Sequence, residues 1–260
     1  MKAMHTAATG MDAQVVRIDT IANNLANANT TGFKESQVDF ADLMYEAVRQ
    51  PGGSQTQDTR MPTGLEIGSG VSPVSTLKVF TQGGVTKTGG ELDMAISGQG
   101  FFQVETPNGE VKYTRDGNFR INADGLVVNS HGYPLYPNIS VPEDATSVAV
   151  GVDGTVSVVT ADGSYSRVGE IQLANFVNPA GLSSEGKNLF AETEASGVPT
   201  TGMPGQEGFG EIRQGYLEES NVDVVTELVD LISAQRTYEL NSKVVKAGDR
   251  VLQATNYLAR

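Results

Sequence analysis

The end of the chain carries the pattern that most constrains its fold. No proline occurs from Ser220 to the last residue, and apolar residues recur there at intervals of seven. This spacing places side chains on one face of an α-helix. A second apolar set flanks the first, so a single partner helix cannot bury the whole stripe. The first set is Val224, Leu231, Tyr238, Val245 and Leu252, and the flanking set is Leu240, Val244, Ala247, Val251, Ala254 and Leu258.

The first residues predict a second amphipathic helix. Its apolar residues follow alternating steps of four and three, and Gly10 interrupts it at a cost of about 1 kcal/mol relative to alanine. An isolated helix this short is marginal in water. We therefore expect the two terminal helices to pair with each other as a coiled-coil-like inner core. The apolar residues are Met4, Ala8, Met11, Val15, Ile18, Ala22 and Leu25.

The segment from Ile21 to Lys34 ends the first predicted helix. Gly32 can take the left-handed conformation of a helix C-cap, and Phe33 can pack back on the helix. An ordinary C-cap would explain both residues. Asparagine is a poor helix former, so packing or hydrogen bonding across chains would explain the four asparagines, and a solvated face is the alternative. They are Asn23, Asn24, Asn27 and Asn29.

Residues 105–195 read as all β. Five Asx-Gly pairs separate short alternating apolar segments, and such pairs are strong signals of tight hairpins. We place the charged pair Arg115 and Asp116 at a solvated turn. The aspartates could instead bind calcium, but no loop combines D-x-D-x-D with a distal glutamate. The five pairs begin at Asn108, Asp116, Asp124, Asp153 and Asp162.

Two stretches rich in glycine and proline interrupt the predicted helices and strands. Gln50 to Gly70 is typical of a linker or a long excursion, with a flexible surface loop as the alternative. Gly197 to Gly210 marks the exit from the β region. Gly98-Gln99-Gly100 lies between two alternating apolar runs and predicts a bend or bulge. It does not indicate a nucleotide-binding loop, because no complete motif of that kind follows it.

Composition excludes several functions. Lys and Arg number 18 against 31 Asp and Glu, a net charge of −13 that repels nucleic-acid phosphates. The first residues lack the apolar core of a signal peptide, and no apolar run is long enough to cross a bilayer. The absence of cysteine does not decide the compartment. With two histidines and no nucleophile motif we expect no enzyme, no cofactor and no metal site, and His131 reads as a turn residue. Acidic pairs for glycoside hydrolysis stay open as an alternative.

Four runs together resemble one family. ANNLANANTTGFK at Ala22 to Lys34 is similar to the N-terminal signature of the flagellar basal-body rod and hook proteins, ANNLAN followed by T-x-GFK. The runs LDMAISGQGFFQV from Leu92 and YTRDGNF from Tyr113 match sequence motifs in the central part of that family. Gln214 to Lys243 matches its C-terminal signature. On these runs the chain is identified as a member of this axial protein family.

Within the family the chain is more similar to distal-rod members than to hook members, which are usually much longer. The QPG start at Gln50 and the later P-x-GL-x-IG-x-GV run match the distal-rod insertion, over 46–70. The resemblance implies that this insertion packs between neighbouring subunits in a rigid, straight rod. The matching residues of the later run are Pro62, Gly64, Leu65, Ile67, Gly68, Gly70 and Val71.

The resemblance also implies a function and partners. The chain would polymerise helically with itself into the distal rod, which transmits motor torque across the periplasm to the hook. Its partners would be the proximal rod proteins, the hook protein, the P-ring and L-ring bushing proteins and the flagellar type III export apparatus. It would lie between periplasm and outer membrane, exported without a cleaved signal peptide and without membrane insertion. The alternatives are a sibling axial protein, either proximal rod or hook, or a non-flagellar enzyme or binding module.

We therefore expect an α+β fold in three parts. The inner core takes 1–33 and 220–260, an extended connecting region takes 34–90 and 196–219, and an outer β domain takes 91–195. Terminal helices that are marginal alone would fold on polymerisation. The asparagines, with Gln235, Asn241 and Asn256, are candidates for fixing register. Candidate assembly residues are Met11, Val15, Ile18, Asn23, Asn24, Leu25, Asn27, Gly32, Phe33, Leu65, Ile67, Val224, Leu228, Leu231, Tyr238, Asn241, Val245 and Leu252.

Overall fold

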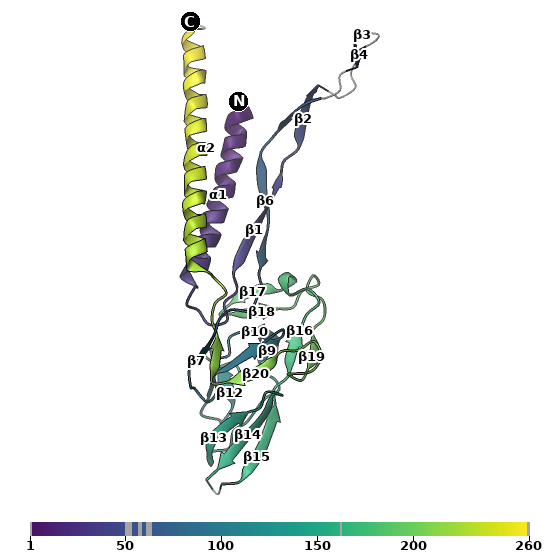
Figure 1. Ribbon diagram of the computed structural model, residues 1–260, viewed down its shortest axis with the longest axis vertical. Coiled ribbons are helices and arrows are strands. Elements are labelled where there is room, and N and C mark those ends of the chain that lie inside the picture. Colours follow the sequence, from purple (N-terminus) through teal and green to yellow (C-terminus); the bar gives the residue numbers. More distant parts are fainter. Residues whose placement is uncertain (1, 50–53, 57–58, 61–63, 162, 259–260) are drawn as a thin grey trace. The chain divides into compact units, whose positions relative to one another are not determined.

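The chain folds into two helices at its ends and many short strands between them, which confirms the predicted α+β class (Figure 1). This computed structural model describes residues 2–49, 54–56, 59–60, 64–161 and 163–258. The chain divides into two compact units. We call them the helical unit, which comprises Met1–Leu25, Ser36–Leu77 and Val224–Arg260, and the β body, which comprises Ala26–Glu35 and Lys78–Asp223.

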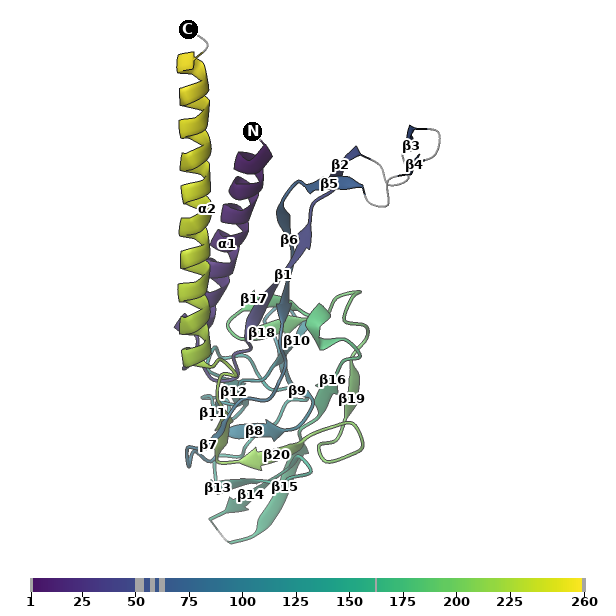
Figure 2. The ribbon, with the colours of Figure 1, turned by 45° about the horizontal axis from the view of Figure 1, so that its top comes forward.

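The helical unit contains both helices. Helix α1 spans Lys2–Ala26 and helix α2 spans Val224–Leu258. They run side by side in opposite directions, so that the N- and C-terminal ends of the chain lie at the same end of the pair (Figures 1 and 2). Before α2, the side chain of Asn221 bonds to Glu35, Val79 and Thr81 within the β body.

A long two-stranded ribbon completes the helical unit. Strand β1 pairs with β6, and farther out β2 pairs antiparallel with β5. The pairing of β2 with β5 agrees with the predicted long excursion, and 50–53, 57–58 and 61–63 of that stretch lie outside the described residues. The strands are β1 (Ser36–Asp42), β2 (Tyr45–Arg49), β3 (Ser54–Thr56), β4 (Thr59–Arg60), β5 (Leu65–Gly68) and β6 (Val71–Lys78).

The β body is built around a six-stranded sheet, and its other strands form small sheets of two or three. The order of the six-stranded sheet is β17-β18-β10-β9-β16-β19. The three-stranded sheet is β13-β14-β15, and β20 pairs with β8, β21 with β7 and β11 with β12. The strands are β7 (Val85–Lys87), β8 (Met94–Ser97), β9 (Phe101–Glu105), β10 (Val111–Thr114), β11 (Phe119–Ile121), β12 (Val127–Asn129), β13 (Ala145–Val150), β14 (Thr155–Thr160), β15 (Tyr165–Glu170), β16 (Leu173–Asn175), β17 (Ser183–Gly186), β18 (Leu189–Ala191), β19 (Thr200–Gly202), β20 (Glu211–Gln214) and β21 (Tyr216–Glu218), with a 3₁₀ turn at Pro179–Gly181.

Most of the Asx-Gly pairs join paired strands, as predicted. The pairs at Asn108, Asp124 and Asp153 connect β9–β10, β11–β12 and β13–β14, and the turn after β14 contains Gly163, Asp162 lying outside the described residues. The pair at Asp116 is the exception, because β10 and β11 belong to different sheets. There the Gly117 carbonyl accepts a hydrogen bond from the Met94 amide, and a Cβ on Gly117 would collide with the Met94 carbonyl.

Two apolar clusters form the core of the β body. The larger one gathers side chains from β8, β9, β12, β14 and β16. The smaller one is aromatic, and its rings meet edge to face, the favoured geometry for such pairs. The predicted bend at Gly98 and Gly100 is present, with positive φ angles of 117° and 128°, between β8 and β9. The ring members of the smaller cluster are Phe80, Phe101, Tyr113, Phe176 and Phe190.

Candidate assembly site

Polar contacts join the two helices of the helical unit. Arg17 Nη2 lies 3.2 Å from Asp230 Oδ1, and Asn24 Nδ2 donates to Glu227 Oε1 over 2.9 Å. The first pair is half exposed, so it contributes little to stability. The second is buried, where an unmade hydrogen bond would be costly.

Asn24 makes several hydrogen bonds with its side chain. Besides its bond to Glu227, its amide donates to the Ser36 carbonyl and its oxygen accepts from the Ser36 amide, each over 2.9 Å. The side chain therefore connects α1, α2 and the start of β1 within one chain. Asn23 is exposed and Asn27 half-buried. A role of these residues between subunits stays a prediction.

Two glycines leave room for side chains of the opposite helix. A Cβ at Gly10 would lie 2.8 Å from the amide nitrogen of Asn241, and a Cβ at Gly248 would lie 2.7 Å from Cγ of Met4. Each helix thus offers one glycine to a side chain of the other. These two contacts indicate a defined register between α1 and α2.

The apolar residues of α2 are only partly covered. Leu231, Val245 and Leu252 are half-buried, whereas Val225 is 71% and Val229 is 62% exposed. On α1, Met11, Ile18 and Leu25 are half-buried. The remaining sequence-predicted residues of the pair, all exposed, are Val15, Val224, Leu228 and Tyr238, and further exposed apolar residues of α2 are Ile232, Leu240, Val244, Val251 and Tyr257.

The ribbon presents apolar side chains to solvent as well. Leu65 and Ile67, both predicted assembly residues, are exposed on β5. A two-stranded ribbon is marginal by itself in water. Its other exposed apolar residues are Phe40, Met44, Tyr45, Val48, Val74 and Leu77.

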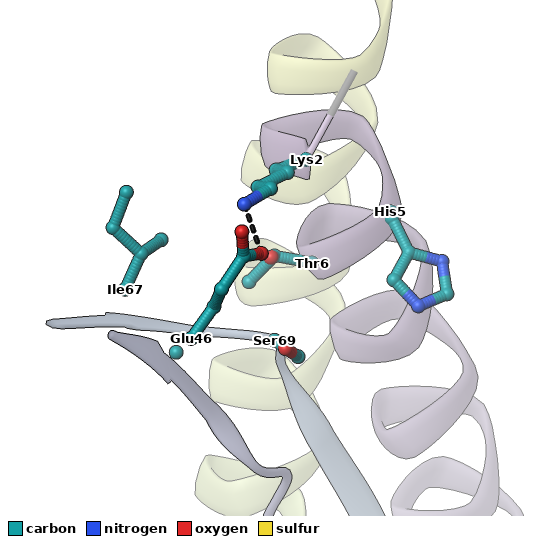
Figure 3. A pocket seen from close by; sticks show the side chains of 7 residues that line it. Lys2, His5, Thr6, Glu46, Ile67 and Ser69 are labelled. Carbon is teal, nitrogen blue, oxygen red and sulfur yellow. Dashed lines mark hydrogen bonds and ion pairs between the residues drawn. The ribbon is translucent and has the colours of Figure 1, made fainter. Parts of the chain in front are cut away.

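A pocket of about 280 Å³ lies where the first turns of α1 meet the outer ribbon, within the helical unit. In Figure 3, Lys2 reaches across to an ion pair with Glu46, while His5 points away from that pair. The remaining lining is Thr6, Ile67, Gly68 and Ser69. The described residues contain no group of three or more His, Cys, Asp or Glu that could hold a metal ion.

A second site, which sequence reasoning missed, lies inside the β body. Lys34 Nζ and Glu218 Oε1 are 2.6 Å apart, and neither side chain has accessible surface. Arg115 Nη1 lies 3.3 Å from the other oxygen, Glu218 Oε2, and Arg115 is only 4% exposed. We call Lys34, Arg115 and Glu218 the buried ionic cluster. Each belongs to a different family signature: TTGFK, YTRDGNF and QGYLE.

Backbone groups also bond to the buried ionic cluster. Lys34 Nζ also donates to the Thr81 carbonyl over 2.7 Å, and Arg115 Nη2 donates to the Gly98 carbonyl over 2.9 Å. The Gly83 amide donates to Glu218 Oε1. The guanidinium of Arg115 lies 5.3 Å from the centre of the Phe101 ring, a cation–π distance. These contacts offset the high cost of burying charge.

Burial controls the titration of this region. Desolvation lowers the pKa of Lys34 and of Arg115, and the charge of Glu218 opposes it in both cases. Desolvation likewise raises the pKa of Asp116, whose carboxylate accepts hydrogen bonds from Thr31 and from the Asn118 amide. The cluster thus holds two cations and one carboxylate, so its charges do not balance. The contacts that surround both cations keep them buried there.

The expected solvated turn at Arg115 and Asp116 is wrong. Arg115 is buried and Asp116 is half-buried, because the N-terminal segment covers this corner of the body. A Cβ at Gly32 would lie 2.5 Å from the Asp116 amide nitrogen and 2.6 Å from the Arg115 carbonyl carbon. Gly32 has the predicted left-handed φ of 65°, but it does not cap α1, which ends at Ala26. Gly32 and Phe33 are instead buried in the β body. The sequence did contain one signal of a buried charge, which is the single charged residue next to apolar and glycine residues in GFK.

Comparisons with known proteins match parts of the chain near both ends and in its centre. Three family models match. They are described as "Flagella basal body rod protein" over residues 4–34, "Flagellar hook protein FlgE/F/G D1 domain" over 95–158 and "Flagellar basal body rod FlgEFG protein C-terminal" over 213–258. All three members of the buried ionic cluster fall within these matches. None of the described helices combines the length and the apolar character needed to cross a membrane.

Curated relatives match over nearly their full length. The flagellar basal-body rod protein FlgG of Buchnera aphidicola subsp. Schizaphis graminum is 47% identical over 252 residues, covering 96% of each chain. FlgG of Caulobacter vibrioides is 45% identical over 99% of each chain. The hook-basal body complex protein FlhP of Bacillus subtilis is 31% identical over 98% of each.

Among solved structures, the hook protein FlgE2 of Helicobacter pylori is 16% identical, with a TM-score of 0.26, and covers 71% of this chain and 43% of its own. The two structures differ too much for that likeness to bear on the fold. The names of the curated relatives describe a structural component and no catalytic activity, as expected for this chain. The chain belongs to the family of flagellar basal-body rod proteins FlgG.

Proposed function

We propose that this chain is the structural subunit of the distal rod, polymerising head to tail into a rigid helical tube that transmits torque to the hook. The observation that carries this proposal is the apolar surface of α2 that α1 leaves uncovered. Surface of this kind marks a site of association. Head-to-tail contacts whose rotation does not close produce a helical filament.

The inner core of the tube would be a coiled-coil-like layer of terminal helices, from 1–33 and 220–260. Their half-buried seam residues, Met11, Ile18, Leu25, Leu231 and Val245, would pack within one subunit. The exposed residues Val15, Val224, Leu228 and Tyr238 would then face neighbouring copies. Residues 91–195 would form the outer domain, joined by the connecting region of 34–90 and 196–219.

Polar side chains would fix the register of the assembled helices. Asn24 and Asn241 already contact the opposite helix in the same subunit. Asn23 and Asn27 remain candidates for contacts between subunits, as single buried polar groups specify register in coiled coils.

The ribbon would pack between neighbouring subunits through Leu65 and Ile67. An isolated ribbon with exposed apolar residues on both strand pairs gains stability only from a partner. Covering it on both faces would resist bending, in keeping with a straight rod.

Assembly would be coupled to folding of the chain ends. Ordering a residue costs roughly 1 to 2 kcal/mol in backbone entropy, whereas burying apolar surface returns about 25 cal/mol per Å². The exposed stripe of α2 would supply that area only in the polymer. A subunit with unfolded ends can be threaded through a narrow exporter, which fits export by the flagellar type III apparatus without a cleaved signal peptide.

The partners and location of the chain follow from the same proposal. The proximal rod proteins and the hook protein would meet the two ends of the tube, and the P-ring and L-ring proteins would surround it between periplasm and outer membrane. Neither nucleic acid nor insertion into a membrane enters this function.

Electron microscopy and sedimentation of the concentrated chain test the proposal. Wild type should form straight tubes, and the double variant Val225→Asp, Val229→Asp should remain monomeric with an unchanged β body. The matched control is Val177→Asp with Val198→Asp, two even more exposed valines on the β body, which should still polymerise. A wild-type chain that stays monomeric at every concentration and salt, or a helix variant that polymerises like wild type, contradicts the proposal.

A further inference from the structure

The buried ionic cluster joins three distant parts of the sequence within the β body. Lys34 comes from the segment that follows α1, and Glu218 ends strand β21, which leads toward α2. Arg115 comes from the centre of the chain. The N-terminal segment thus adds a second buried cation to an ion pair that the central part of the chain and the C-terminal strand already form.

Backbone hydrogen bonds extend this attachment on the N-terminal side. The Gly32 amide donates to the Glu218 carbonyl over 2.8 Å, and the Asn188 side chain donates to the Thr31 carbonyl over 3.1 Å. Lys78 Nζ donates to the Lys34 carbonyl and lies 4.6 Å from the centre of the Phe33 ring.

The C-terminal side is fixed by Asn221. Its oxygen accepts from the Glu35 amide over 2.7 Å, and its amide donates to the Val79 carbonyl over 2.8 Å. The Val79 amide in turn donates to the Glu35 carbonyl over 2.9 Å. Asn221 therefore bonds to both Glu35 and Val79 within the β body, shortly before α2 begins at Val224.

The terminal helices contrast with this attachment. Only Ala234 and Glu227 are buried among the described side chains of α2, and α1 buries Ala7, Ala13, Ile21 and Asn24. Segments with few buried contacts open at low free energy, whereas segments held by buried hydrogen bonds open only with the core.

We propose that the buried ionic cluster is a lock that keeps Thr31–Glu35 and Glu218–Asn221 folded on the β body before assembly, so that folding on polymerisation is confined to the helical unit. The lock rests on the proposed function, since it sets where assembly-coupled folding stops. Without it, loss of order in the helices would spread into β7, β21 and the corner at Arg115.

Amide hydrogen exchange of the dilute full-length chain tests the lock. The amides of Gly32, Glu35 and Val79 should exchange as slowly as those of the core strand β9, while the amides of α1 and α2 exchange fast. Equal, fast exchange in Thr31–Glu35 and in α1 would overturn the lock. The same chain, concentrated, reports separately on polymerisation, so a locked chain that never forms tubes would contradict only the proposed function.

A lysine variant separates the lock from general stability. Lys34→Met leaves Glu218 paired with Arg115 and keeps most of the side-chain volume, so the body should stay folded. Exchange at Gly32 and Glu35 should rise roughly 10- to 100-fold, because an unmade buried hydrogen bond or ion pair carries that penalty. The matched control is Lys112→Met, which breaks the pairs of Lys112 with Glu110 and Glu185 in the same body.

The control should leave exchange at Gly32 and Glu35 unchanged. An equal rise in both variants would show that Thr31–Glu35 follows the overall stability of the body, and this result would overturn the lock. If Lys34→Met unfolds the whole body, exchange of β9 rises with it, and the wild-type comparison of Thr31–Glu35 with α1 then decides.

Discussion

Asn241 in α2 carries its side-chain amide over Gly10 in α1, so closely that a Cβ at position 10 would lie 2.8 Å from the Asn241 nitrogen. Glycine costs a helix about 1 kcal/mol relative to alanine. Its presence in the middle of α1 therefore has a packing reason, which is space for a polar side chain of the other helix.

The variant Gly10→Ala tests this packing. The substitution adds helix propensity but displaces the Asn241 amide, the movable end of a side chain, so we expect a net change within about 0.5 kcal/mol in the free energy of unfolding. Relative to the single variant Asn241→Ala, the double variant Gly10→Ala, Asn241→Ala should show the full gain of about 1 kcal/mol in helix stability. Thermal melts followed by circular dichroism measure both. Additive effects of the two substitutions would show that the contact does not exist in solution.

Gly32 is expected to behave in the opposite way. Its φ is 65°, and the atoms that an added Cβ would meet belong to the backbone of Arg115 and Asp116, which cannot turn aside. Left-handed backbone alone costs a non-glycine residue about 1 to 2 kcal/mol, and the collision adds to it. Gly32→Ala should therefore destabilise the β body by more than about 2 kcal/mol in urea unfolding.

Gly109→Ala is the matched control for Gly32→Ala. Gly109 has a φ of 80° and nothing within 4 Å of the added Cβ. The free energy of unfolding of Gly109→Ala should therefore fall only by the cost of the left-handed backbone, about 1 to 2 kcal/mol. Equal losses at the two positions would remove the backbone collision as the reason for glycine at position 32.

The sequence predicts the local parts of this fold well. The seven-residue recurrence in α2 and the Asx-Gly turns depend on residues close in the chain, so both terminal helices and most hairpins were predicted. The pair at Asp116 failed because its geometry depends on the Met94 carbonyl, from another strand. A turn signal reports local conformation and not which strands it joins.

The candidate site was predictable only in part. Apolar periodicity pointed to the exposed stripe of α2, but the buried ionic cluster pairs Lys34 with a residue 184 positions away. Charged residues are usually exposed, so Arg115 was assigned to the surface. For Asn24 the sequence left packing and bonding across chains open, and it did not point to Ser36 and Glu227 of the same chain as partners.

Tyr113 should make the β body sensitive to alkali. Burial raises the pKa of its hydroxyl to about 12, with a further contribution from the charge of Glu192, whereas an unfolded tyrosine titrates near 10. The folded state thus keeps a proton that the unfolded state loses. Stability from this group is complete below pH 10 and is lost as the pH rises through 12.

Tyr113→Phe should remove that loss. The difference in unfolding free energy between wild type and variant should be constant from pH 7 to 9 and should then shift in favour of the variant by at most about 1.4 kcal/mol per pH unit, less where water reaches the hydroxyl. Urea unfolding at several pH values measures the difference, in which the other titrating groups cancel. The exposed tyrosine variant Tyr165→Phe serves as control. Parallel curves for wild type and Tyr113→Phe up to pH 12 would refute the shift.

The negative charge of the chain is concentrated in the β body. The body holds 20 Asp and Glu against 9 Lys and Arg, a net charge of −11 out of −13, so the helical unit is nearly neutral. Three of the nine cations, Lys34, Lys112 and Arg115, are buried, which leaves the surface of the body more acidic still. Copies brought together by the helical unit therefore repel one another through their bodies.

Polymerisation should consequently strengthen with salt. Between about 0.02 M and 0.3 M NaCl the Debye length falls from roughly 20 Å to below 10 Å, which screens the repulsion between bodies. Sedimentation should show the critical concentration of wild type falling severalfold across this range. A body variant with four neutralised carboxylates should polymerise at low salt and depend less on salt; its substitutions are Glu143→Gln, Glu192→Gln, Glu194→Gln and Glu207→Gln.

A control with unchanged charge distinguishes repulsion from other surface effects. It changes four exposed uncharged residues of the same body to glutamine and should retain the salt dependence of wild type. Weaker polymerisation of wild type at high salt would show that attraction between opposite charges, not repulsion, governs assembly. The control substitutions are Ser130→Gln, Ser184→Gln, Thr200→Gln and Thr201→Gln.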